Sequence, residues 1–580
     1  MPRSGAKLRI PHGPTPPMSR LPPALLPLRN TTFRRLWLAS VVAWLGTWLQ
    51  NTGAGWLMTV LAPQPLIVAM VQAATIMPVF LLALPGGALA DIIDRRVFLL
   101  GTQFWTILAA VALAALTLAH SMTAGLLLAL TFAIGIGSAL TAPAWSAIVP
   151  ELVPREDLVQ AIALNGVGFN LTRAIGPALA GFLILLGGTS LAFSLYAFSI
   201  LAVIAALLTW RRGRRFTGLP REHLLSAMRA GVRFVRHTPA IQRAMVRTAA
   251  YSLPAAAPWA LLPLIVKEQL HLGAGMYGLI LGMMGIGGVT SGMLLPLVRN
   301  RVTRNATVLA CSFSSCSGIA LLAVSHHWLV AAVGMLLFGI GWTSAYATIQ
   351  AAAQLVCPHW VRARSLAIYQ LAQNGALTLG SFAWGALGGQ IGLSATLLVA
   401  AGLGVAVAIG VQKFDIEQRG ALTTESVLEK GPSVVPEAPA AELVPLLRHA
   451  RGQVMETIHY RVRAGERQAF LAVMQQLRQV RGRAGAVFWQ IYENVAHPEE
   501  WLELWSMESW ADHLRESGRM SDEDHAVLAS AARFQSDPAN SRPARYLAVD
   551  PHRGAEGAAA ADSPDQPPRA VRLPGLQRSG

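Results

Sequence analysis

Two short stretches of this 580-residue chain place charged side chains where they could do chemistry. The segment GGALADIIDRR, residues 86–96, carries two aspartates and two arginines between long apolar runs. Arg173 lies about fifteen residues inside another apolar run, where a charged group is costly and by default functional. The planar guanidinium suits carboxylates and phenolates, so Arg173 is a candidate for binding an anionic group. The alternative is a structural arginine bonded to backbone carbonyls and asparagine side chains.

Uncharged amides inside the apolar runs form a second set of candidates. An amide both donates and accepts hydrogen bonds, so such residues can line a binding cavity together with Arg173. Taken singly, each amide is alternatively a hydrogen bond between two helices. The predicted cavity residues are Gln50, Asn51, Asn170, Arg173, Gln350, Gln370, Gln373 and Asn374.

Several kinds of chemistry are not indicated by the sequence. The three cysteines have neither paired nor metal-ligand spacing, so no disulfide framework and no metal site is predicted. The phosphate-binding pattern GxxxxGK[ST] does not occur, which argues against ATP-driven chemistry. Asp91, Glu151 and Glu268 lie only at the ends of apolar runs, so no buried carboxylate is available as a proton carrier. No catalytic set and no cofactor is predicted.

The elements that must position these side chains are twelve apolar runs of helical length. Hydrophobic residues make up 53% of the chain and charged residues 13%, which is about half the roughly 25% of a soluble globular chain. A helix needs about 20 mostly apolar residues to cross a bilayer. The predicted spans are residues 36–61, 66–90, 97–118, 123–149, 158–186, 191–210, 244–266, 276–298, 306–324, 328–355, 365–391 and 393–411.

Arginines alternate between the loops that join these runs. They follow the even-numbered spans, whereas the alternate loops hold only Lys267. Because basic loops stay in the cytoplasm, both termini of this multi-pass chain are predicted to lie there. The formal net charge of +17 is dispersed in short clusters without interleaved aromatic residues, which argues against nucleic-acid binding.

The two halves of the apolar region repeat each other. Residues 151–181 are echoed by residues 354–385, so that Pro154 corresponds to Pro358 and Gly176 to Gly380. A six-plus-six duplication joined by a basic hinge loop is the organisation of a two-bundle transporter. The predicted parts are a cytoplasmic arm (1–32), a first bundle (33–210), a basic cytoplasmic loop (211–243) and a second bundle (244–414).

The composition changes after the second bundle. Residues 415–451 are predicted to be a charged, proline-bearing linker, and residues 554–580 a disordered tail. Between them, residues 452–553 follow the pattern strand-helix-strand-strand-helix-strand, the ferredoxin-like arrangement. The predicted fold class is therefore an all-α membrane protein with twelve transmembrane helices in two six-helix bundles, plus a small C-terminal ferredoxin-like α+β domain.

The charged loop resembles the loop signature of the major facilitator superfamily, a glycine, an aspartate four residues later and then a basic pair. The family's basic residue and glycine are replaced here by Ile92 and Asp94. The resemblance implies a charge cluster that latches the bundles on the cytoplasmic side and breaks when they rock. The alternative is a set of ordinary positive-inside anchors. The matching residues are Gly87, Asp91, Arg95 and Arg96.

The segment NLTRAIGPALAG resembles the antiporter motif of the same superfamily, which is typical of exporters. Gly176, Pro177 and Gly181 match it, whereas Thr172 and Ala180 replace expected glycines. Small residues at this spacing let helices approach closely, and a generic glycine-proline packing site is the alternative.

The C-terminal segment WLELWSMESWADHLRESGRMSDED resembles the soluble tail of enterobactin-exporter-like proteins, the transmembrane secretion effectors. The resemblance implies a secondary transporter that exports a small organic molecule, such as a siderophore or drug, across the bacterial cytoplasmic membrane by alternating access. Protons are the coupling ion that the family implies, and the tail implies dimerisation. The alternatives are an importer on the same fold and a membrane-tethered, monooxygenase-like enzyme.

Overall fold

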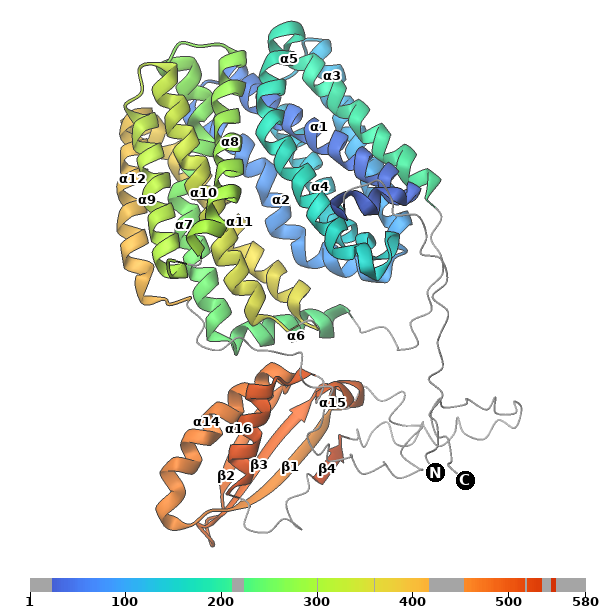
Figure 1. The fold of residues 1–580 in the computed structure, drawn as a ribbon, viewed down its shortest axis with the longest axis vertical. Helices are drawn as coiled ribbons and strands as arrows, with labels where there is room; N and C mark the ends of the chain where they lie inside the picture. The colour runs from blue at the N-terminus through green and yellow to red at the C-terminus, as the bar shows by residue number, and fades with distance from the viewer. Residues whose placement is uncertain are drawn as a thin grey trace, which may run out of the picture. The chain divides into compact units, whose positions relative to one another are not determined.

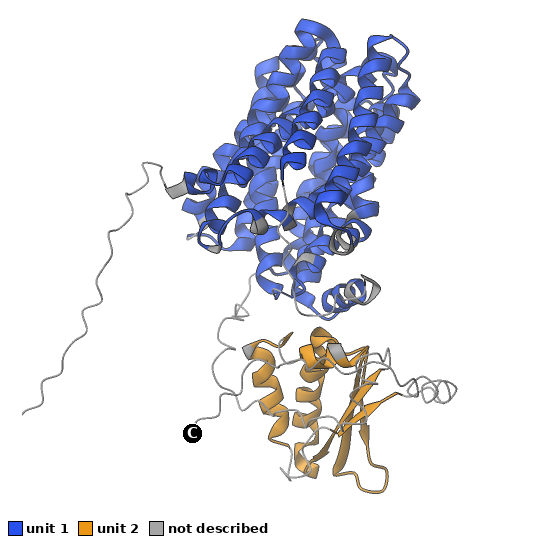
Figure 2. Ribbon diagram, turned by 90° about the vertical axis from the view of Figure 1, so that its right-hand side faces the viewer, with its two compact units in different colours: residues 1–422 blue, residues 423–580 orange. Residues whose placement is uncertain are grey.

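A computed structural model describes residues 23–210, 224–299, 301–358, 360–416, 453–516, 519–534 and 544–548. The chain divides into two compact units, residues 1–422 and 423–580 (Figure 2). Most of the predicted arm (1–32), nearly all of the linker (415–451) and the whole tail (554–580) lie outside the described residues.

The first bundle follows a short 3-10 helix, η1 (Pro23–Arg29). Asn30 and Asp94 start helices α1 and α3 because their side chains accept hydrogen bonds from the first free backbone N–H groups. Pro65 is the first residue of α2, a position where its missing N–H costs nothing. The helices are α1 (Thr31–Leu61), α2 (Pro65–Ile92), α3 (Arg95–Leu118), α4 (Ala124–Leu152) and α5 (Leu158–Thr209), with η2 (Arg155–Asp157) before the last.

Helix α5 is 52 residues long and contains both the fifth and the sixth predicted spans. Its backbone leaves the helical conformation only at Gly187 and Gly188. Gly188 has φ of +71°, in the left-handed region that favours glycine. The two spans are therefore joined by a two-residue break instead of a loop.

The second bundle consists of helices α7 to α12 (Figure 1). A π-helical turn, η3 (Ile265–Gln269), follows the three prolines of α7. The segment predicted as a basic loop (211–243) contains the amphipathic helix α6 (Leu224–Arg236), whose Phe234 and Val235 pack into a core with residues of α7 and α11. The other elements are α7 (Pro239–Leu264), α8 (Ala274–Arg299), α9 (Arg304–Ala323), α10 (Trp328–Val356), α11 (Arg362–Ile391), α12 (Leu393–Gly410) and η4 (Val411–Lys413).

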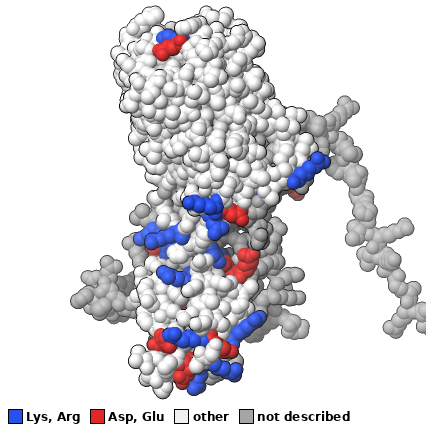
Figure 3. All heavy atoms as spheres, turned by 90° about the vertical axis from the view of Figure 1, so that its left-hand side faces the viewer, with Lys and Arg blue, Asp and Glu red and all other residues white. Residues whose placement is uncertain are grey.

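Among the described residues, nine helices are long and apolar enough to cross a membrane, counting α5 once. Helices α1 and α11 are not among the nine, although each coincides with a predicted span. These two helices carry five of the predicted cavity amides, which lower their hydropathy. The membrane-spanning character of the unit is thus confirmed, and the count of twelve crossings stays a prediction. On the face shown in Figure 3, most of the helical unit's surface carries no Lys, Arg, Asp or Glu.

The second unit is a four-stranded antiparallel sheet with helices on one face (Figure 1). The strand order β2-β3-β1-β4 confirms the predicted ferredoxin-like arrangement. The predicted single helix before the last strand is instead two helices, the second of which begins with a capping box of Ser521 and Asp524. The elements are β1 (Val454–Arg461), η5 (Ala464–Glu466), α14 (Arg467–Ala484), β2 (Phe488–Glu493), β3 (Glu500–Met507), α15 (Trp510–Glu516), α16 (Asp522–Ala532) and β4 (Ala544–Leu547).

Candidate binding cavity between the helical bundles

Helices α5 and α8 cross between the two bundles at backbone contact. A Cβ added at Gly278 of α8 would lie 2.6 Å from the Cα of Gly181 and would overlap the carbonyl oxygen of Pro177. Two turns further, a Cβ at Gly285 would lie 2.5 Å from the Cα of Ala174. The glycine-proline motif of α5 thus makes a tight interface with the other bundle, as its small residues predict.

Helices α2 and α11 close the same end of the unit on its other side. A Cβ at Gly385 of α11 would lie 2.5 Å from the Cβ of Ala69 and 3.1 Å from the Cα of Leu66 on α2. Near this end, the ammonium group of Lys267 in η3 donates a hydrogen bond to the carbonyl oxygen of Thr59 in α1. The bundles are therefore held together where α1 ends and α2 begins.

The opposite end of the α5–α8 contact is open. Val167 and Asn170 continue the contact row on α5, and both are exposed. Gly292 and Pro296 continue it on α8 and are exposed as well, and a Cβ at Gly292 would meet nothing within 4 Å. Helices α5 and α8 therefore separate toward the end that carries the α2–α3 loop.

Arg173 lies where the tight contact ends. Its guanidinium Nη2 donates a hydrogen bond of 2.6 Å to Oγ1 of Thr343 on α10, and it packs on Gly288 of α8. Arg173 thus links the first bundle to the second. Asn170, predicted to be its neighbour in the cavity, instead donates to the carbonyl oxygen of Gly166 in its own helix, at 2.9 Å.

A cavity of about 240 Å³ lies between the bundles. Among the described residues, none with a charged side chain lines it. Helices α1 and α2 supply its amides and hydroxyls, and helices α7, α8 and α10 supply mostly apolar and aromatic groups. The lining residues are Trp48, Asn51, Thr52, Gln72, Thr75, Ile76, Pro258, Trp259, Leu262, Tyr277, Leu281 and Met335.

Of the predicted cavity residues, the structure places only Asn51 in this lining. Gln50 is 1% exposed and lies off the cavity. Gln370 is exposed, whereas Gln350, Gln373 and Asn374 are half-buried. Sequence reasoning missed Gln72 and Thr75, which a search for polar residues within the second span would have found, and it missed the aromatic residues because such side chains are common in any membrane helix.

The predicted latch is described only in part. Gly87 and Asp91 belong to α2, and their side chains lie outside the described part of the structure. Arg96 donates to the carbonyl oxygens of Leu207 and Leu208, at 3.1 and 2.9 Å, at the C-terminal end of α5. Arg95 is half-buried. Since α3 and α5 belong to one bundle, this contact of Arg96 stiffens that bundle and does not bridge the two.

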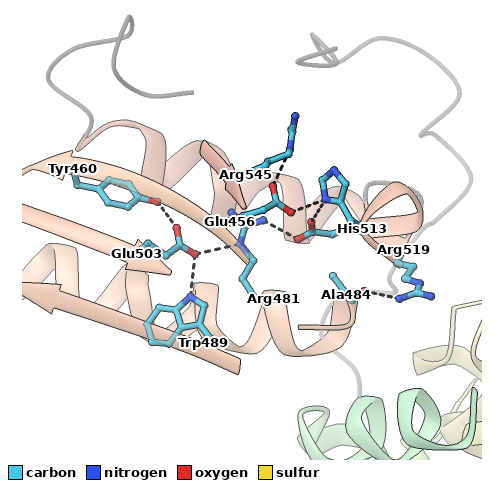
Figure 4. A network of polar contacts seen from close by, with 10 residues as sticks. Glu456, Tyr460, Arg481, Ala484, Trp489, Glu503, His513, Arg519 and Arg545 are labelled. Atoms are coloured by element: carbon cyan, nitrogen blue, oxygen red, sulfur yellow. Dashed lines mark hydrogen bonds and ion pairs between the residues drawn. The ribbon is translucent and has the colours of Figure 1, made fainter. Parts of the chain in front are cut away.

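The C-terminal unit contains a buried ionic network (Figure 4). The carboxylate of Glu503, fully buried on the core face of β3, accepts hydrogen bonds from the hydroxyl of Tyr460 at 2.7 Å and the indole of Trp489 at 2.9 Å. Its counter-ion is Arg481 of α14, whose Nε lies 3.2 Å away and whose guanidinium covers the ring of Trp505 at 3.5 Å from its centroid. The network ties helix α14 to the sheet.

Arg481 also reaches a second set of buried groups. Its Nη1 lies 2.9 Å from Glu516, and His513 lies 2.6 Å from Glu456, which Arg545 approaches at 3.4 Å. Burial raises the pKa of Glu516. Burial also acts to raise the pKa of Glu456, but the hydrogen bond and charge of His513, with both arginines, bring it below its ordinary value. Glu456, His513 and Glu516 have the spacing of metal ligands, but the arginines already neutralise these carboxylates, so the donor set does not fit a cation.

A family model described as "Transmembrane secretion effector" matches residues 23–552, which include both units. The chain belongs to this family. It is therefore a transporter of the major facilitator superfamily and not an enzyme, which excludes the monooxygenase alternative. The matched region confirms that the C-terminal sheet is part of the family's architecture.

Curated relatives of this transporter are named as transporters or exporters of siderophores. It is 25% identical to the staphyloferrin A transporter of Staphylococcus aureus over 296 residues, which are 50% of this chain and 73% of that protein. It is 28% identical to the enterobactin exporter EntS of Salmonella typhi over 219 residues, 37% of this chain. The chain matches about half (51%) of the exporter's length.

Solved structures confirm the fold of the helical unit. A bacterial homologue of the iron transporter ferroportin in the inward-facing state superposes with a TM-score of 0.52 at 19% identity, over 66% of this chain and 98% of that one. A POT family transporter with a bound thioalcohol-conjugated peptide gives a TM-score of 0.55 at 12% identity, over 66% and 96%. At these identities the likeness shows the fold alone, which is that of secondary transporters.

Proposed function

We propose that this transporter exports a small organic molecule, of the siderophore or drug type, by alternating access. The observation that carries the proposal is the pair of helices α5 and α8, one from each bundle, in contact at one end and apart at the other, with a cavity between the bundles. Such an arrangement is one of the two states that alternating access requires. The names of the relatives, an exporter and a transporter of siderophores, support the substrate type.

The charge bias of the loops supports an orientation in the bacterial cytoplasmic membrane with both termini inside. In that orientation the open end, which carries the α2–α3 loop, faces the cytoplasm. A cavity open to the cytoplasm can load a molecule made inside the cell, as export requires. The glycine-proline motif of α5, which is typical of exporters in this superfamily, supports the same direction.

Two roles are proposed for the candidate residues in this state. Asp91, with Gly87 and the basic pair that follows, is proposed to latch the bundles when the cytoplasmic end closes. Arg173, which already contacts both bundles, is proposed to hold the inner rim of the interface together. Its contact with Thr343 favours this role over direct anion binding.

Two partners complete the proposal. Protons are the proposed coupling ion on family resemblance. A second copy is the proposed partner of the C-terminal unit, whose sheet has a face opposite α14 and α16 with partly exposed apolar residues. Phe488 and Tyr546 on that face are 45% and 53% exposed.

Transport into inverted membrane vesicles tests the direction. Vesicles that contain the protein should accumulate a siderophore or dye from the medium when a proton gradient is imposed, and right-side-out vesicles should not. Vesicles without the protein are the control. Accumulation only in right-side-out vesicles would reverse the direction and establish the importer alternative.

A further inference from the structure

The wall of the cavity between the bundles selects against charge. None of its lining residues is ionisable at neutral pH, since the tyrosine is a weak acid. An anion or cation placed there would lose its hydration without gaining a counter-ion. Arg173, the charged residue predicted to face the cavity, lies on Thr343 and Gly288 instead. The part of a substrate that enters this cavity is therefore uncharged.

The same wall offers aromatic faces from both bundles. Trp48 of α1 and Trp259 of α7 both line the cavity, with ring centroids 6.5 Å apart and planes inclined by 21°. Tyr277 of α8 lines it too and stacks on Trp56 of α1 at 5.9 Å. A flat ring lying against these indoles gains offset-stacking contacts that an aliphatic ring cannot make. Because the two indoles belong to different bundles, a stacked ligand contacts both bundles at once.

Three lining residues have a polar atom whose hydrogen-bonding capacity is unused within the described chain. These atoms are Oδ1 of Asn51, Oγ1 of Thr52 and Nε1 of Trp259, and all three are buried. Leaving such groups unpaired in an apolar setting costs free energy, which a ligand that pairs with them recovers. The terminal torsion of asparagine is broad, so the Asn51 amide turns toward a ligand at little cost.

A hydroxyl group on an aromatic ring fits this set because it donates and accepts at once. It can donate to the amide oxygen of Asn51 and accept from the hydroxyl of Thr52. Resting on the proposed transport function, we propose that the cavity binds a neutral, hydroxyl-bearing aromatic ring of the transported molecule, stacked against Trp48 and Trp259. The ionised form of the same ring is excluded because none of the described lining residues carries a positive charge.

Three probes of matched shape test the recognition on the purified full-length protein in lipid nanodiscs, by ligand-observed NMR. The probes are meta-hydroxybenzamide, meta-hydroxybenzoate and the cyclohexane analogue of the amide. The amide is expected to bind, the benzoate to show no binding at neutral pH, and the cyclohexane analogue to bind about 2- to 10-fold more weakly than the amide. Equal binding of amide and benzoate would overturn the exclusion of charge, and equal binding of amide and cyclohexane analogue would overturn the aromatic site.

Variants locate the binding. Trp48→Leu and Trp259→Leu are each expected to weaken meta-hydroxybenzamide about 2- to 10-fold, and Trp48→Phe to restore most of the loss because it keeps a ring. Trp328, at the start of α10, is 36% exposed and lies outside the cavity. Trp328→Leu should therefore leave the affinity for meta-hydroxybenzamide unchanged. A Trp48→Phe protein that binds as poorly as Trp48→Leu, or a Trp328→Leu protein that loses binding, would overturn the assignment.

Flux measurements separate this inference from the transport function. If meta-hydroxybenzamide binds at Trp48 and Trp259 but no compound of the siderophore or drug type crosses the membrane, the proposed function fails and the site stands. If another class of compound is transported while the probe does not bind, the site fails and the function stands.

Discussion

Replacing Arg481 with methionine should strongly destabilise the C-terminal unit. The guanidinium lies 3.2 Å from Glu503 and 2.9 Å from Glu516, and the Arg481 side chain is only 6% exposed. Methionine keeps the packing over Trp505 but leaves two buried carboxylates without their cation. Removing one partner of a buried ion pair costs about 3–5 kcal/mol, a large share of the roughly 5–15 kcal/mol that holds a domain folded.

Urea and thermal unfolding of residues 452–553, followed by tryptophan fluorescence, measures the effect. The segment has its own hydrophobic core and is expected to fold alone, which circular dichroism checks first. The melting temperature of Arg481→Met should fall by more than about 12 °C. Arg478→Met, on the exposed side of the same helix, is the matched control and should stay close to the wild type.

The two uncompensated carboxylates predict a second result in the same series of variants. Adding Glu503→Gln and Glu516→Gln to Arg481→Met should recover a substantial part of the lost stability, because both uncompensated charges disappear. A loss below about 1 kcal/mol in the single variant, or no recovery in the triple variant, would show that the network is not the source of stability.

Other perturbations address the remaining contacts. Lys267→Ala removes a charged hydrogen bond between the bundles, so the closed end should open about tenfold more often than in the matched Glu268→Ala variant. Spin-label distances across that end measure the opening, and an unchanged distance distribution would contradict the prediction. Asp91→Asn should insert normally but transport more slowly in vesicles, and full activity would remove the latch. Arg173→Ala should slow transport while leaving the affinity for neutral aromatic probes unchanged, and a loss of that affinity would place the arginine in the site. Burial raises the pKa of Glu516, so the wild type loses stability as this carboxyl ionises at a pH above its ordinary pKa of 4.5. Glu516→Gln should therefore gain stability relative to the wild type as the pH rises through that range. Parallel curves of stability against pH for the two proteins would refute this.

The sequence predicted the elements well because their signals are local. Runs of about 20 apolar residues and strands of alternating residues depend only on near neighbours in the chain. The merger of the fifth and sixth spans into α5 was not predicted, because a pair of glycines ordinarily indicates a loop. Helix α6 was missed because its arginines dominate a segment whose apolar residues, such as Phe234, face the protein.

The buried groups of the C-terminal unit show why sites are harder to predict. Alternation along β1 places Val454, Glu456 and Ile458 on one face, and the apolar residues correctly predict that this face is buried. A glutamate in a buried row is unexpected from the sequence, because its partners come from distant segments. Arg545 of β4 and His513 of α15 pair with Glu456. The cavity between the bundles depends likewise on helices that no local pattern brings together.

The turns at the closed end of the helical unit are very short, from the single residue Gly392 to the five residues 119–123. On that side of the membrane the unit offers helix ends and almost no flexible chain. A protease has few cleavage sites on that side, and an antibody or a receiving protein has little exposed loop to bind. A reporter tag placed at that end would therefore need an inserted spacer to be seen.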